Sequence, residues 1–164
     1  MSENISIPSG LPKSEVYSAL LPQLHALVEG ENDTIANLAN IVAALKEAFG
    51  FFWIGFYFVK QDNDQEVMVL GPFQGPVACT RIGFGKGVCG AAWKDSKTIV
   101  VPDVEEFPGH IACSSLSRSE IVVPVFVNQK VAGVLDIDST ELSTFDQDDA
   151  LALEEVAKLI SKIL

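Results

Sequence analysis

The chain has 164 residues, a length that suits one globular domain with a sizeable core rather than two domains. Hydrophobic residues make up 48% of the chain and charged residues 20%, which excludes collagen-like, low-complexity and disordered proteins. Because 11 Lys and Arg residues stand against 22 Asp and Glu residues, the formal net charge is −11, and we expect no nucleic-acid partner.

The N-terminal residues 1–8 lack the basic and apolar regions of a secretory signal. No apolar run elsewhere reaches the roughly 18 residues that a membrane helix needs. We therefore expect no membrane association and a location in the reducing cytoplasm. The chain has three cysteines, an odd number, which favours buried thiols, a metal site or redox chemistry over a disulfide framework.

Two amphipathic helices are predicted in an N-terminal segment of about 14–49, because apolar residues recur there at helical spacing. The first covers about 14–28, and Pro22 predicts a kink within it. The second begins at Asn32 or Asp33, either of which can act as an N-cap. The two helices form a helical hairpin.

A sheet is predicted over about 51–139, where short β-branched and aromatic runs alternate with Gly, Pro and Asp. Asn128 and Gln129 form a short turn between the last two strands, which makes that pair antiparallel. A brief helix is predicted over 90–95. The six expected strands are 51–59, 66–70, 77–82, 98–101, 120–127 and 130–138.

The last segment, about 145–164, is predicted to be a helix with an apolar stripe on one face. Thr144 and Gln147 match the spacing of a capping box at its start. No internal repeat or linker is visible. We therefore expect residues 1–164 to form a single α+β domain, with the helices from both ends of the chain packed on one antiparallel sheet.

The first strand has two apolar faces. Alternation places Trp53, Gly55 and Tyr57 on one face and Ile54 and Phe56 on the other. The missing side chain at Gly55 could leave a slot for a small ligand between two aromatic rings. Ordinary core packing is the alternative interpretation of the same pattern.

Two carboxyl groups, Asp136 and Asp138, fall on one face at the end of the last strand. Such a pair suits an ammonium-bearing ligand or a shared proton, although it also fits a solvated strand end. Glu120 starts the neighbouring strand, but a strict two-residue hairpin places it opposite Ile137, on the wrong face. Convergence of the three groups requires a longer turn, a bulge near Pro124 or an irregular strand start.

The cysteines occupy different predicted environments: Cys79 lies in a strand, Cys89 precedes a short helix and Cys113 lies in a polar loop. Cys113 is the candidate nucleophile, because His110 and Arg118 could favour its thiolate. A zinc site from three Cys and His110 fits poorly, since no two ligands are closely spaced. Inert buried thiols remain an alternative.

The segment 85–90 (GKGVCG) matches the dinucleotide-binding pattern G-x-G-x-x-G. The connection from Gly90 to the next strand at Thr98 is too short for the helix of a parallel crossover. Glycine-rich turn geometry is therefore the favoured interpretation.

Together, several motifs and the spacing of all three cysteines resemble the free methionine-(R)-sulfoxide reductases, which are single GAF domains. The resemblance extends from about Trp53 to Ser139. It implies a GAF fold with an about six-stranded antiparallel sheet. We expect no cofactor and no metal. The motifs are GPFQGPVAC at 71–79, GVCG at 87–90, GHIAC at 109–113, SEIVVP at 119–124 and GVLDIDS at 133–139.

The resemblance also implies roles for the cysteines. Cys113 corresponds to the catalytic cysteine and Cys79 to the resolving cysteine that pairs with it. Cys89 matches a third cysteine, an alternative resolving or disulfide-relay thiol. The reaction implied is reduction of free methionine-(R)-sulfoxide through a sulfenic acid and an intramolecular disulfide, with thioredoxin as the expected reductant.

In the same family, carboxylates at the positions of Glu120, Asp136 and Asp138 bind the substrate and polarise the sulfoxide, and Trp53 and Tyr57 match its pocket wall. Attack by a thiolate on sulfur requires a proton for the departing oxygen, and crowded carboxyl groups can keep one. The remaining charge would hold the α-ammonium of a free amino acid.

Two rival functions are a GAF domain that binds a small ligand without catalysis and a redox sensor whose Cys79–Cys113 bridge switches a partner. Turnover of sulfoxide separates both from the reductase. A homodimer formed through the terminal helices is a possible assembly.

Overall fold

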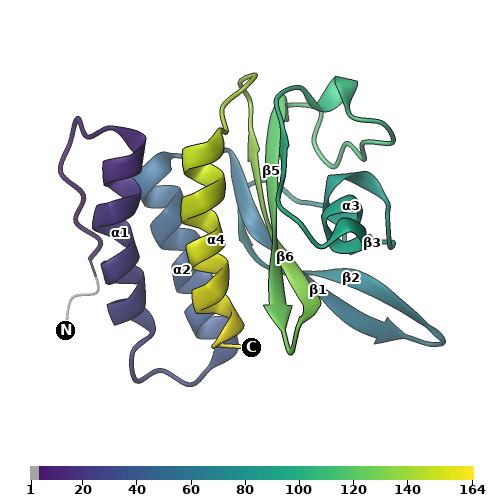
Figure 1. The fold of residues 1–164 in the computed structure, drawn as a ribbon, viewed down its shortest axis with the longest axis horizontal. Helices are drawn as coiled ribbons and strands as arrows, with labels where there is room; N and C mark the ends of the chain where they lie inside the picture. Colours follow the sequence, from purple (N-terminus) through teal and green to yellow (C-terminus); the bar gives the residue numbers. More distant parts are fainter. Residues whose placement is uncertain (1–3) are drawn as a thin grey trace.

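The computed structural model describes residues 4–164, which form one six-stranded antiparallel sheet with helices on both faces (Figure 1). The strand order is β3-β2-β1-β6-β5-β4. The strands are β1 (Trp53–Asp62), β2 (Gln65–Gln74), β3 (Arg81–Ile82), β4 (Ile99–Val101), β5 (Ser119–Val127) and β6 (Lys130–Ser139). The helices are α1 (Lys13–Val28), α2 (Thr34–Phe49), α3 (Gly87–Asp95) and α4 (Gln147–Ser161), with a 3-10 turn at Val104–Glu106.

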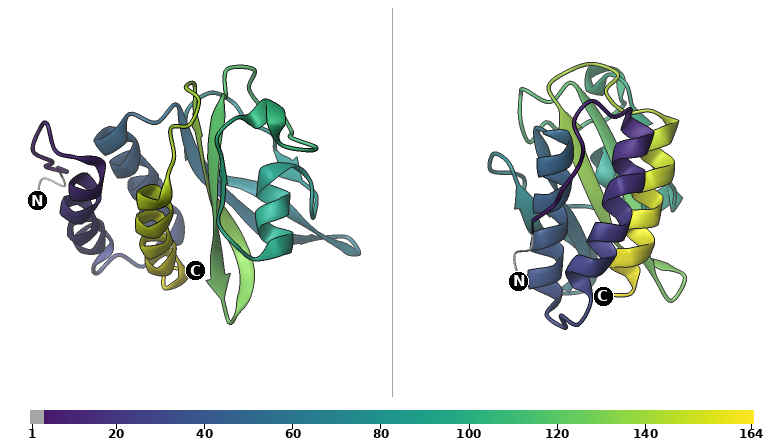
Figure 2. Two further views of the ribbon diagram at one scale, coloured as in Figure 1. Left: turned by 45° about the horizontal axis from the view of Figure 1, so that its top comes forward. Right: turned by 90° about the vertical axis from the view of Figure 1, so that its left-hand side faces the viewer.

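The N- and C-terminal helices α1, α2 and α4 pack together on one face of the sheet, and α3 lies on the other (Figure 2). The main core fills the space between the three helices and the sheet. Ile54 and Phe56 of β1 are fully buried in this core, whereas Trp53 and Tyr57 belong to a second cluster on the α3 side. The alternation predicted for β1 and the α+β fold class are both confirmed.

Helix α2 begins and ends as its sequence predicts. Asp33 is the N-cap, and its side chain accepts a hydrogen bond from the backbone N–H of Ala36. Gly50 ends the helix with a φ of 68°, a left-handed conformation that favours glycine. Helix α1 continues from Lys13 to Val28 with Pro22 inside it.

The capping box predicted for the last helix is wrong in its residues. Asp146 caps α4 and accepts hydrogen bonds from the backbone N–H groups of Asp148 and Asp149. In return the Asp149 carboxylate accepts the N–H of Asp146 at 2.9 Å. The Thr144 hydroxyl instead donates to Ser139 Oγ. Asp146 and Asp149 have the same spacing as Thr144 and Gln147 and lie two residues further along the chain. They form the capping box because an ionised carboxylate oxygen is a stronger hydrogen-bond acceptor than a hydroxyl or amide oxygen.

The same Asp149 ties the two ends of the chain together. Its buried carboxylate accepts hydrogen bonds from the Tyr17 hydroxyl at 2.8 Å and from Lys13 Nζ at 2.6 Å. Both donors belong to α1. This pairing fixes α1 against α4 while satisfying a buried charge.

The strand expected over 77–82 is much shorter, because only Arg81 and Ile82 pair with β2. Cys79 therefore lies in the loop 75–80 and not in a strand. Strand β2 extends instead to Gln74, where it pairs with Ile54 of β1. Side chains from β1 hold the loop in place of ladder hydrogen bonds.

A bulge resolves the register of the last hairpin. The pairing of β5 with β6 shifts between Val125 and Phe126, which moves Glu120 opposite Asp138 and no longer opposite Ile137. Of the arrangements that would let the three carboxyl groups converge, the structure adopts the bulge. Among residues 4–164, no helix is both long and apolar enough to cross a membrane.

Candidate active site

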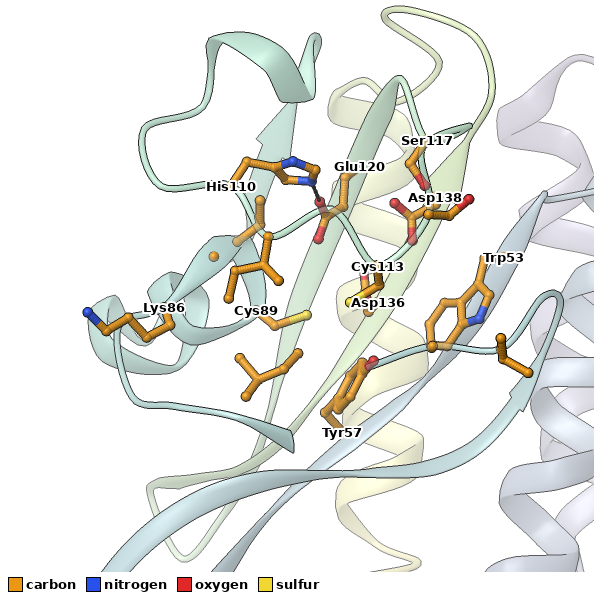
Figure 3. Close-up of a pocket in the computed structure, with 17 residues that line it drawn as sticks. Trp53, Tyr57, Lys86, Cys89, His110, Cys113, Ser117, Glu120, Asp136 and Asp138 are labelled. Atoms are coloured by element: carbon orange, nitrogen blue, oxygen red, sulfur yellow. Dashed lines mark ion pairs between the residues drawn. The ribbon is translucent and has the colours of Figure 1, made fainter. Parts of the chain in front are cut away.

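A pocket lies on the α3 side of the sheet, between the sheet and the loops that carry Cys79 and Cys113 (Figure 3). It is partly enclosed and open to solvent. Seven of the eight predicted site residues line it: Trp53, Tyr57, Cys89, Cys113, Glu120, Asp136 and Asp138. Cys79 is absent from the lining, but a disulfide joins it to Cys113.

Three carboxyl groups come together in the pocket because β1, β6 and β5 are adjacent strands. Asp138 lies between Trp53 of β1 and Glu120 of β5 in the ladder. Asp136, two residues before it on the same face, pairs with Gly55. Glu120 and Asp136 are buried, each residue only 6% exposed. Bringing the three carboxyl groups together would lower the stability of the fold if all three were ionised.

Burial is the main reason that all three carboxyl groups hold protons more tightly than usual. It raises the pKa of Glu120 well above the ordinary value, with the charge of Asp138 adding to the effect. Burial, then the charges of Glu120 and Asp138, raise the pKa of Asp136 in the same way. Burial raises the pKa of Asp138 to about 6, against the opposing effects of the Ser117 hydroxyl and the His110 charge.

Asp136 also carries an orphaned atom. Its Oδ1 is buried and has no hydrogen-bond partner among residues 4–164. One oxygen of Asp136, one of Glu120 and Cys89 Sγ lie within 4.8 Å of one another, a spacing that could hold a metal ion. Metal binding would require the thiol and both carboxyl groups to be deprotonated, whereas burial raises the pKa of all three. A proton-sharing cluster fits these groups better.

His110 approaches this cluster from the loop that carries Cys113. Its Nε2 lies 3.5 Å from Oε2 of Glu120, and both side chains are largely buried. Sequence reasoning placed His110 beside the Cys113 thiol and did not foresee its partner. Arg118, the other cation considered for that role, does not line the pocket. No spacing along the chain could have revealed the contact between His110 and Glu120, because the loop that carries His110 has no regular structure.

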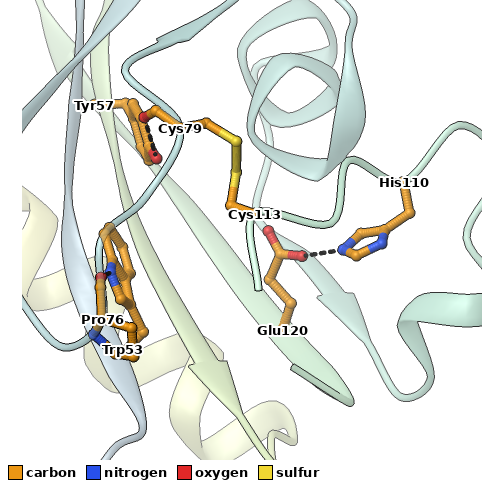
Figure 4. Close-up of a disulfide and its surroundings, with 7 residues drawn as sticks. All are labelled: Trp53, Tyr57, Pro76, Cys79, His110, Cys113 and Glu120. Atoms are coloured by element: carbon orange, nitrogen blue, oxygen red, sulfur yellow. Dashed lines mark hydrogen bonds and ion pairs between the residues drawn. A yellow bond between two sulfur atoms is a disulfide. The ribbon is translucent and has the colours of Figure 1, made fainter. Parts of the chain in front are cut away.

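The disulfide joins two loops that are 34 residues apart in the sequence (Figure 4). The Cα atoms of Cys79 and Cys113 are 5.5 Å apart. Cys113 is exposed and Cys79 is half-buried. Cys89 is a free, buried thiol on α3 whose pKa is raised, first by burial and then by the charge of Asp136. Cys89 therefore favours the protonated thiol over the nucleophilic thiolate.

The two aromatic residues of β1 hold the loop of Cys79 through their polar atoms. Trp53 Nε1 donates a hydrogen bond to the carbonyl of Pro76 at 3.0 Å, and the Tyr57 hydroxyl donates to the carbonyl of Cys79 at 2.9 Å. Their rings stack with centroids 6.1 Å apart. This anchoring of the disulfide loop was not foreseen from the sequence.

The empty slot expected above Gly55 does not exist. A Cβ at this position would come within 2.5 Å of Trp53 Cη2 and would also clash with Phe73 Cβ. The Trp53 ring therefore fills the space that the glycine leaves and stacks on Phe73. The ligand space lies beyond the ring, toward Cys113 and the carboxyl groups.

The glycines of the segment 85–90 serve local geometry, as predicted. A Cβ at Gly90 would lie 2.5 Å from the carbonyl oxygen of Gly83. The backbone N–H of Gly85 donates to the carbonyl of Gly90 at 3.0 Å, which closes the turn before α3. Only glycine permits such a close approach of two backbone segments. The segment places Lys86, a further pocket residue, at the start of α3.

Comparison with known proteins places this arrangement in a family. The GAF domain family matches residues 31–164. The chain is 56% identical over 160 residues to GAF domain-containing protein A of Dictyostelium discoideum, which covers 98% of this chain and 99% of the relative. It is 42% identical over 167 residues to the free methionine-R-sulfoxide reductase of Saccharomyces cerevisiae, covering 98% of this chain and 92% of the relative.

A solved structure gives the same result. The free methionine-R-sulfoxide reductase of Neisseria meningitidis, determined in complex with its substrate, superimposes with a TM-score of 0.91 and 53% sequence identity. The match covers 98% of this chain and 95% of that chain. The chain therefore belongs to the free methionine-R-sulfoxide reductase family of GAF-domain proteins.

Proposed function

We propose that this protein reduces free L-methionine-(R)-sulfoxide to L-methionine with Cys113 as the nucleophile and Cys79 as the resolving cysteine. One observation carries the proposal: a disulfide between these two cysteines lies at a pocket lined by three carboxyl groups with raised pKa values. The disulfide is the expected product of one catalytic cycle. The carboxyl groups can donate the proton that the departing sulfoxide oxygen requires. The preference for the R epimer rests on the family relationship alone.

In the first step the reduced Cys113 thiolate attacks the electrophilic sulfoxide. The sulfoxide oxygen passes to Cys113 as a sulfenic acid, and one proton is taken up as methionine leaves. A carboxyl group that keeps its proton near neutral pH can hydrogen-bond this oxygen and donate. Glu120 and Asp136 are suited to this role, since burial raises the pKa of both.

The same cluster favours the free amino acid as substrate. The α-ammonium group would neutralise a carboxylate, and Asp138 is the natural partner because its pKa of about 6 leaves it mostly ionised at neutral pH. A methionine sulfoxide within a peptide lacks this ammonium and would leave the carboxylate buried without a partner. Trp53 and Tyr57 supply an aromatic wall for the methyl and methylene groups.

In the second step the Cys79 thiol attacks the sulfenic acid, which forms the disulfide and releases water. An external dithiol must then reduce the bridge. We propose thioredoxin for this role, in the cytoplasm, where a dithiol pool is kept reduced. We propose that Cys89 is an alternative resolving or relay thiol outside the main cycle, because its sulfur lies near Glu120 and Asp136 and not at the bridge.

We further propose that the whole chain acts as one GAF domain and forms a homodimer through its terminal helices. Ile35 of α2 and Leu151 of α4 support this assembly, because their apolar side chains are 69% and 55% exposed. Sedimentation analysis of the protein tests the dimer directly, and a monomer at micromolar concentration would contradict it.

A coupled assay tests the activity. Thioredoxin, its reductase and NADPH are supplied with each epimer of methionine sulfoxide, free and within a peptide. NADPH consumption should require the free R epimer, and Cys113→Ser should abolish it. The Cys79→Ser variant should still release methionine in a single turnover. Turnover retained in Cys113→Ser would overturn the assignment of the nucleophile, and binding of the sulfoxide without turnover would favour a sensor.

A further inference from the structure

Three large apolar side chains that are close in sequence to Cys79 or Cys113 are exposed to solvent. Val77 is 88% exposed, Ile111 41% and Leu116 60%. Val77 and Ile111 each lie two residues before a cysteine of the bridge, and both line the pocket beside Cys113. Leu116 follows Cys113 by three residues in the same loop. We call these three residues the apolar collar.

The two sulfurs of the bridge differ in access. Cys113 is exposed, whereas Cys79 is half-buried behind the loop that Trp53 and Tyr57 hold. The hydrogen bonds of the segment around Cys113 stay within its own loop: the N–H of Cys113 donates to Ile111 and that of Leu116 to Ser114. Because the rate of disulfide exchange depends on access to the attacked sulfur, an incoming thiolate reaches Cys113 more readily.

From these observations we propose that a protein dithiol docks on the apolar collar and attacks Sγ of Cys113. The inference rests on the reductase function proposed above and specifies how the enzyme is regenerated. An apolar collar around an exposed redox disulfide fits a partner whose own reactive thiol is surrounded by apolar surface. A small dithiol would have no need of the collar.

The exchange balances as two thiol displacements. The partner's thiolate bonds to Cys113 Sγ, the Cys79–Cys113 bond breaks, and Cys79 leaves as a thiolate that takes up a proton. The second thiol of the partner then loses its proton and attacks the partner's own sulfur in the mixed disulfide. Cys113 departs as a thiolate, ready for the next sulfoxide, and the partner is left oxidised. Throughout, the Tyr57 hydroxyl keeps the backbone of Cys79 in place.

A trapping experiment tests the site of attack. The oxidised full chain is mixed with thioredoxin whose second active-site cysteine is replaced by serine, so that the mixed disulfide cannot be resolved. Acid quenching within the first turnover and peptide mass spectrometry then locate the adduct. The adduct on Cys113 should exceed that on Cys79 at least about tenfold. A predominant adduct on Cys79, or no adduct on Cys113, would overturn the inference.

The collar is tested with the variant Leu116→Glu and the matched control Leu142→Glu. Leu142 is 47% exposed on a different loop. Loss of a buried leucine contact should raise the KM for thioredoxin about tenfold in Leu116→Glu, while the control keeps the wild-type value. An unchanged KM in Leu116→Glu would contradict the docking surface.

Dithiothreitol separates this inference from the proposed function. With this small dithiol as reductant, the wild type and both leucine variants should reduce free methionine-(R)-sulfoxide at equal rates. If wild-type turnover with dithiothreitol is absent, the proposed function fails. If it is present while the adduct forms on Cys79, only the docking inference fails.

Discussion

The carboxyl cluster should lower the free energy of unfolding at neutral pH. The variant Asp138→Asn measures how much of this loss of stability comes from Asp138. Asp138 is a half-buried acid, and its surroundings in the folded protein raise its pKa from 3.8 to about 6. Because the folded state binds its proton more tightly, the unfolded state releases it first. The free energy of unfolding therefore falls as the pH rises from about 3.8 to about 6.

The size of the effect follows from the shift. A change of about two pKa units at about 1.36 kcal/mol per unit gives about 3 kcal/mol. The amide introduced by Asp138→Asn stays neutral at every pH, and its oxygen could still accept from Ser117. At pH 7 the Asp138→Asn variant should therefore be about 3 kcal/mol more stable than the wild type, which raises Tm by roughly 6–12 °C for a chain of this size. Near pH 3.5 the two proteins should be equally stable.

Thermal and urea unfolding of both oxidised proteins at intervals between pH 3.5 and 7.5 provides the assay. The difference between variant and wild type cancels the contributions of groups that are distant from the cluster. The variant also removes the charge that raises the pKa values of Glu120 and Asp136, which changes stability at neutral pH in the same direction. Asp64→Asn, in the exposed turn between β1 and β2, is the matched control, because it removes an equal charge away from the cluster. A difference for Asp138→Asn that is constant with pH, or a variant less stable at pH 7, would refute the reasoning.

Two further predictions concern residues that contact this site. In Tyr57→Phe the carbonyl of Cys79 loses its hydrogen-bond donor. Methionine release in a single turnover should persist, whereas disulfide formation should slow about fivefold. The number of free thiols in samples quenched at successive times measures the rate of disulfide formation. An unchanged rate would mean that Tyr57 does not position Cys79. In His110→Asn, the positive charge that lowers the pKa of Asp138 is removed. Binding of the substrate ammonium group needs ionised Asp138, so kcat/KM of the wild type should fall below about pH 6. In the variant this fall should begin at a higher pH. An unchanged pH profile would show that His110 does not act on Asp138.

The parts of the fold that depend on local periodicity could be predicted from the sequence. A strand has a period of two residues, so the opposite faces of Trp53 and Ile54 followed directly from their positions. The glycine at position 50 and the aspartate at position 33 marked the bounds of α2. The order and spacing of the cysteine motifs indicated the family, which the relatives confirm.

Features that depend on tertiary contacts could not be predicted in the same way. The bulge beside Phe126 decides whether Glu120 joins the cluster, and nothing in the hairpin sequence fixes its position. Cys79 lies in a loop because hydrogen bonds from distant Trp53 and Tyr57 replace a strand ladder. The contact between His110 and Glu120 likewise joins segments that are brought together only by the folded sheet.

A single turnover without reductant tests the central claim most directly. The fully reduced protein is mixed with an equimolar amount of free methionine-(R)-sulfoxide, quenched and mapped by mass spectrometry. The account predicts a stoichiometric release of methionine, a new bridge between Cys79 and Cys113, and Cys89 recovered as a free thiol. Absence of methionine, or a bridge that contains Cys89 in place of Cys79, would contradict it.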